Sequence, residues 1–88
     1  DCMNLPIAGG AAPISKALEE SIKGSLPDAV VTVTAGSGGH FSLVVVSSAF
    51  AGKGPVDAQR LVYGAIAHLM KGESAPVHAI DSLRTKLP

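Results

Sequence analysis

The sequence predicts a two-layer α+β domain in which two helices cover one face of a small three-stranded mixed sheet. Three observations support this fold class. Apolar residues recur at helical spacing in two stretches, β-branched residues gather in short runs, and Gly or Pro separates these segments. The expected order is helix, strand, strand, helix, strand, which is typical of helices packed on one side of a sheet. The 88 residues suffice for one domain, expected over residues 13–88 after a flexible lead-in over residues 1–12.

The first helix is expected over residues 13–26, where the sequence reads PISKALEESIKGSL. Ile14, Leu18 and Ile22 lie four residues apart and form one apolar stripe along such a helix. Charged residues occupy the positions between them and predict a solvated opposite face.

A β-hairpin is expected next. The β-branched run over residues 29–34 and the run HFSLVVVSS over residues 40–48 are typical of strands. The glycine-rich segment AGSGG over residues 35–39 cannot hold a regular element and is expected to be the connecting loop. Residues 49–55 are expected to form a turn region.

Apolar residues at helical spacing predict a second helix over residues 56–71. Its apolar face is expected to consist of Leu61, Val62, Ala65, Ile66, Leu69 and Met70. A third strand is expected over residues 76–85, because Pro76 is tolerated at a strand beginning. Since this strand follows a helix, we expect it to pair in parallel with a strand of the hairpin.

Composition excludes several classes of function. Seven basic residues balance seven acidic ones, so strong sequence-independent binding to nucleic acid is not expected. The longest apolar stretch is far shorter than the roughly 20 residues that span a bilayer, so no membrane partner is expected. The single cysteine, Cys2, cannot form an internal disulfide, which favours an intracellular, reducing compartment; cytosol and organelle are left open. Cys2 itself is expected to be without function.

No enzyme signature stands out, and we expect no catalytic activity. No nucleophile elbow or HExxH motif is present. The glycine-rich stretches AGGAA and AGSGG lack the Lys and the Ser or Thr that directly follow the glycines of a phosphate-binding loop.

Three histidines are the candidates for chemistry. His68, in the last half of the second helix, is most simply a surface residue near a helix C-terminus. For His40, which opens the second strand, and His78, within the third, a structural histidine and a ligand both stay open on the residues alone. Two histidines without a cysteine or carboxylate cluster form at most half of a metal site, with a partner supplying the rest.

Three basic residues form a second, weaker candidate for a binding surface. Lys53 and Arg60 lie around the start of the second helix, and Arg84 lies in the third strand. These three could form a modest basic surface for a partner or nucleic acid, although ordinary solvated charges are the simpler explanation.

Several stretches together resemble the BolA family. They are HFSLVVVSSAFAGK, RLVYGAI, and VHAI followed by LRT. The family pattern combines an aromatic-led strand ending in Val-Ser, a Phe-x-Gly-Lys turn, a helix with Arg-Leu-Val and a terminal Val-His-Ala strand. The matching residues are Phe41, Val46, Ser47, Phe50, Gly52, Lys53, Arg60, Leu61, Val62, Tyr63, Val77, His78 and Ala79. The resemblance spans about residues 13–88 and implies an α+β fold similar to class II KH domains.

The resemblance implies a shared iron–sulfur site. A monothiol glutaredoxin would be the partner, its cysteine and the thiolate of glutathione providing part of the ligands of a [2Fe–2S] cluster. His78 would be the first ligand from this chain and His40 the second. The cluster is expected only in the complex and not in the isolated chain, which is expected to be a monomer. The function implied is an adaptor in Fe–S cluster assembly, transfer or iron regulation.

The resemblance also implies an alternative, a KH-like nucleic-acid-binding transcriptional regulator that contacts DNA or RNA weakly. Ala58 and Gln59 stand where the family usually carries Arg-His, so the usual basic pair is missing. The zero net charge and the lack of a Gly-x-x-Gly loop between helices also count against this alternative. The hairpin loop carries no cysteine, which leaves His40 as its best metal ligand.

Overall fold

A computed structural model describes residues 11–88. It has the element order that the sequence predicts, with one additional 3-10 turn: α1 Ala11–Ser25, β1 Val30–Ala35, β2 His40–Val46, η2 Ser48–Phe50, α2 Pro55–Met70 and β3 Ala79–Lys86. The α+β class is therefore confirmed. α1 begins at Ala11 instead of Pro13, while most of the expected lead-in over residues 1–12, with Cys2, lies outside the described residues.

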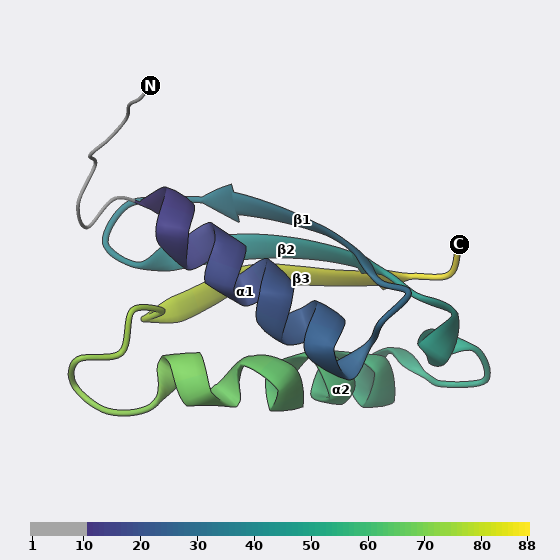
Figure 1. Ribbon diagram of the computed structural model, residues 1–88. Coiled ribbons are helices and arrows are strands. Elements are labelled where there is room, and N and C mark those ends of the chain that lie inside the picture. Colours follow the sequence, from purple (N-terminus) through teal and green to yellow (C-terminus); the bar gives the residue numbers. More distant parts are fainter. Residues whose placement is uncertain (1–10) are drawn as a thin grey trace, which may run out of the picture.

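The sheet has the order β1-β2-β3. β1 pairs antiparallel with β2, and β3 pairs parallel with β2, which confirms both the hairpin and the expected parallel third strand. Figure 1 shows the strands as one layer and the two helices as the other.

The core lies between the helices and one face of the central strand. Phe41, Leu43 and Val45 alternate along β2 and are buried, because successive side chains of a strand point to opposite faces. They pack with Leu18 and Ile22 of α1. The residues that α2 adds to this core are Ala58, Val62 and Ile66. No helix within residues 11–88 is both long enough and apolar enough to cross a membrane.

The predicted apolar face of α2 is right except at one edge. Val62 and Ile66 are completely buried, whereas Leu61 is 37% exposed. Ala58, four residues before Val62, takes the inner position instead and is buried. Because residues four apart lie on one helix face, the line Ala58, Val62, Ile66 faces the sheet and Leu61 lies to its side.

The second strand ends at Val46 and not at Ser48 as predicted. The carboxylate of Asp28 binds the two serines that follow Val46. Ser47 Oγ donates to Asp28 Oδ1 at 2.6 Å, while the Ser48 amide and Ser48 Oγ donate to Oδ2 at 2.8 and 2.7 Å. These bonds, from Ser47 first and then from Ser48, lower the pKa of Asp28 from 3.8 to about 2. The chain continues into η2, capped by Ser47.

The third strand begins at Ala79, so the prediction of a strand from residue 76 is wrong at its start. Pro76 has no amide hydrogen to give to a ladder. The amide of Val77 donates to the carbonyl of Leu69 in the last turn of α2, at 3.2 Å. Val77 is completely buried. His78 therefore lies directly before the strand and not inside it.

Candidate functional site

The parallel pairing of β2 and β3 brings His40 and His78 to the same end of the sheet. In a parallel pair the two strands begin at the same edge. His40 is the first residue of β2 and pairs with Ala79, the first residue of β3. His78 directly precedes Ala79, so the two candidate ligands lie next to each other in space although the whole of α2 separates them in the chain.

Gly39 joins the two histidines. Its carbonyl accepts hydrogen bonds from the amides of His78 at 2.8 Å and Ala79 at 3.3 Å. A Cβ on Gly39 would meet the His78 ring, 3.0 Å from Cγ and 3.1 Å from Nδ1. Gly39 also has a φ of +80°, in the region that favours glycine. A glycine is therefore required here both by the backbone and by the close approach of the imidazole.

His40 is held by a carboxylate from β3. Its Nδ1 lies 2.9 Å from Oδ1 of Asp81. Both side chains are about half exposed, 48% for His40 and 57% for Asp81. Since Phe41 faces the core, His40 faces the side of the sheet that lies away from α1 and α2.

The donor set of this site is two imidazoles at the surface, both exposed. Within residues 11–88, no three His, Cys, Asp or Glu side chains are grouped so that they could hold a metal ion. Imidazole nitrogen suits iron as well as zinc and copper. The two imidazoles are therefore chemically able to contribute to the coordination of such a metal.

Two residues of this site, Gly39 and Asp81, were not identified from the sequence. The signal for Gly39 was present, since two glycines directly precede His40 and both Gly38 and Gly39 adopt positive φ. Nothing local marks Asp81, which is 41 residues away from His40 along the chain. Only the pairing of the strands brings them into contact.

His68 lies outside this site, as the sequence predicts for a surface residue. It is exposed on α2, and its Nε2 lies 3.2 Å from Ser21 Oγ of α1. Its nearest polar contact is therefore between the two helices and not at the end of the sheet.

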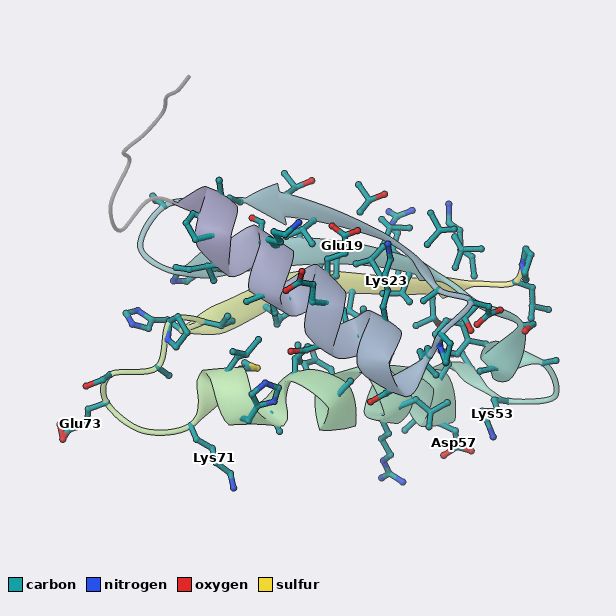
Figure 2. The ribbon with its side chains drawn as sticks, in the orientation of Figure 1. Glu19, Lys23, Lys53, Asp57, Lys71 and Glu73 are labelled. Atoms are coloured by element: carbon teal, nitrogen blue, oxygen red, sulfur yellow. The ribbon has the colours of Figure 1, made fainter. Side chains whose placement is uncertain are left out.

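The structure distributes the three basic candidates over both layers. Lys53 precedes α2, and Arg60 lies on α2 with its Nη1 3.9 Å from Asp57 Oδ1. Figure 2 shows Lys53 and Asp57 at one end of α2. Arg84 pairs with Val44, which faces away from the helices, so Arg84 lies on the open face of the sheet.

A pocket of about 200 Å³ lies at the opposite end of the sheet from the histidines. Lys53 and Lys86 are among its lining residues, together with Phe50, Gly54, Pro55, Ala58, Thr85 and Leu87. Because it adjoins the ends and not the beginnings of β2 and β3, it is separate from the histidine site.

Comparison with known proteins identifies the family of this chain. A family model described as BolA-like protein matches residues 15–88. BolA-like protein 1 of Mus musculus is 34% identical over 98 residues, an alignment that covers 99% of this chain and 69% of the relative. The Homo sapiens protein of the same name is 32% identical over 88 residues, with 90% of this chain and 62% of the relative covered. The chain thus spans about two thirds of the length of these curated relatives.

Solved structures show the same fold. A Bol-like protein from Babesia bovis superposes with a TM-score of 0.71 at 35% identity, over 84% of each chain. The solution structure of BolA1 from Mus musculus gives a TM-score of 0.71 at 30% identity, over 100% of this chain and 77% of that one. The chain belongs to the BolA-like family.

Proposed function

We propose that this protein is an adaptor that shares a [2Fe–2S] cluster with a monothiol glutaredoxin and acts in Fe–S cluster assembly, transfer or iron regulation. The observation that supports the proposal most directly is the meeting of His40 and His78 at one exposed end of the sheet. Membership of the BolA-like family supports the nature of the partner.

The donor set fits part of such a cluster. A [2Fe–2S] cluster takes four protein or cofactor ligands, and two of them can be histidines. His40 and His78 would supply imidazole nitrogens, while the glutaredoxin cysteine and glutathione would supply thiolates. When bound, the cluster supplies one-electron chemistry and transferable iron and sulfide. This division of ligands explains why the chain offers two imidazoles and, within residues 11–88, no complete metal site.

The role of this chain is then to bind and orient. The backbone of Gly39 fixes His78 through two hydrogen bonds to the segment that carries it. Buried Val77, directly before His78, anchors the same segment in the core. The proposal assigns no catalytic step to this chain.

The test is anaerobic reconstitution of the protein with a monothiol glutaredoxin, glutathione, iron and sulfide, followed by visible absorption and circular dichroism. We expect a spectrum that differs from that of the glutaredoxin homodimer and that disappears with His78→Ala. His68→Ala is the matched control, because it removes an exposed imidazole from another part of the molecule. A spectrum identical to that of the glutaredoxin alone would refute the proposal.

The nucleic-acid alternative has less support. Lys53 and Arg60 lie before and on α2, whereas Arg84 lies on the open face of the sheet, and the seven basic residues of the chain are balanced by seven acidic ones. Phosphate contacts by several cationic side chains dominate such affinity and make it fall steeply with salt. If the protein does bind DNA, that steep salt dependence would distinguish the alternative from association through a shared cluster, which chelation abolishes.

A further inference from the structure

We propose that Asp81 is a positioning residue of the histidine site. It holds His40 in the tautomer that is protonated at Nδ1 and so leaves Nε2 as the nitrogen available to a metal. The identity of that metal rests on the function proposed above, whereas the tautomer is a property of this chain alone.

The chemistry of the two groups sets the direction of the hydrogen bond. An ionised carboxylate has only acceptor atoms, so the Asp81 oxygen 2.9 Å from His40 Nδ1 must accept the proton that Nδ1 carries. A neutral imidazole carries one ring proton. With that proton on Nδ1, Nε2 has a free lone pair, which is the form that binds a metal.

A stabilising role explains this pair less well. Asp81 and His40 are both about half exposed, and polar pairs at the surface contribute little to the stability of a fold. The pair can still orient the His40 ring without adding to the stability of the fold. Histidines that bind metals usually donate their other ring N–H to a carboxylate or carbonyl, which fixes both the tautomer and the ring direction. His40 already has this arrangement in the isolated chain.

Asp81 lies at a β-bulge in β3. Phe41 pairs with Ile80, but Ser42 pairs with Ser82, so the ladder passes over Asp81. Residues three apart on a regular strand face opposite sides, yet Ile80 and Leu83 both pack against the core. The extra residue reconciles these two contacts, and bulges often redirect a side chain beside a functional site. Asp81 therefore has no partner residue in β2, and its side chain lies next to His40.

The first experiment measures the tautomer in the isolated protein, from long-range ¹H–¹⁵N correlation spectra of the histidine rings recorded where His40 is neutral. We expect the Nδ1–H form in the wild-type protein. Asp81→Asn should yield a larger share of the Nε2–H form, because an amide can donate to Nδ1 as well as accept from it. Asp57→Asn is the control, since it removes an exposed carboxylate at the start of α2 by the same chemistry (Figure 2). An Nε2–H tautomer in the wild-type protein would overturn the inference.

The second experiment measures how fast a chelator removes iron from the complex with glutaredoxin. Loss of the partner of a ligating histidine typically costs about 10-fold to 100-fold in metal affinity. We expect Asp81→Asn to lose iron at least about 10-fold faster than wild type, and Asp57→Asn to match wild type. Equal rates for Asp81→Asn and wild type would remove the metal-directed role of Asp81 even where the tautomer is as proposed. A wild-type protein that forms no shared cluster would instead refute the proposed function, while the tautomer measurement would still decide what Asp81 does to His40.

Discussion

The imidazole of His78 lies directly on the backbone of Gly39. The carbonyl of Gly39 binds the His78 amide at 2.8 Å, and the His78 ring occupies the space where a Cβ of residue 39 would be. The last residue of the hairpin loop and the candidate ligand before β3 therefore form one unit. Any change in the loop at this position will be transmitted to the site.

Gly39→Ala should destabilise the protein and displace His78. The new methyl group would stand 3.0 Å from Cγ of the ring, and an L-residue at a φ of +80° costs about 1–2 kcal/mol. Thermal unfolding should show the loss of stability, and the shared-cluster spectrum should be weakened or lost.

Gly64→Ala is the matched control for this substitution. Gly64 lies within α2, and a Cβ there would meet nothing within 4 Å. Replacing a helical glycine by alanine typically stabilises by about 0.5–1 kcal/mol. If Gly39→Ala unfolded at the wild-type temperature and gave the wild-type spectrum, the close contact between Gly39 and His78 would have no role.

Alanine substitutions of the three histidines should differ in their effect on the cluster. His78→Ala should abolish cluster sharing with the fold intact, because the ring is exposed and the segment stays anchored by Val77. His40→Ala should weaken the cluster less, and His68→Ala should have no effect. Far-ultraviolet circular dichroism verifies the fold, and visible circular dichroism follows the cluster. An equal loss of the cluster for His40→Ala and His78→Ala would contradict the expected difference between the two ligands.

Asp28 should make folding sensitive to acid. Its pKa is lower in the folded protein, about 2 against 3.8, so its ionised form stabilises the fold. This contribution is complete well above pH 3.8 and is lost as the pH falls from there towards about 2. Denaturant titrations across this range should show a steeper fall in the free energy of unfolding for wild type than for Asp28→Asn.

Ser47 offers an independent check on Asp28, since its hydroxyl provides the largest of the effects that lower that pKa. Ser47→Ala should move the pKa of Asp28 back towards 3.8, which an NMR titration of the carboxyl carbon measures. A wild-type Asp28 that titrates near 3.8 would show that the hydrogen bonds to Ser47 and Ser48 do not hold in solution.

Ile66→Asp should unfold the domain. Ile66 is completely buried against the sheet, and even truncation of such a side chain to alanine costs about 2–5 kcal/mol. A carboxylate placed there would have no partner to compensate its loss of hydration. Ala67→Asp, on the exposed side of the same helix turn, should melt close to wild type. Similar cooperative melts for both variants would mean that Ile66 does not face the core.

Much of this architecture could be predicted because it depends on local patterns. The four-residue spacing of Leu18 and Ile22, and the alternation of Phe41, Leu43 and Val45, reflect the periods of a helix and a strand. These periods are visible in the chain and do not depend on what the elements pack against. The family motif identified His78 as a candidate, and the hairpin loop directed attention to His40.

The boundaries followed from contacts that the chain does not display locally. β2 ends at Val46 because the carboxylate of Asp28, from before β1, accepts a hydrogen bond from the backbone amide of Ser48. β3 starts only at Ala79, because the amide of Val77 is already bound to Leu69 in α2. In each case a polar group outside the sheet accepts a backbone amide hydrogen that would have extended the strand.

The sequence by itself determined the fold class, the order of the elements and the two candidate histidines, because periodicity and residue type are properties of short segments. Only the tertiary structure decided that His40 and His78 share one end of the sheet, that His78 lies on Gly39, and that Asp81 binds His40. The physical reason is that parallel pairing and a β-bulge set the register between strands, and register depends on how α2 carries the chain back across the core.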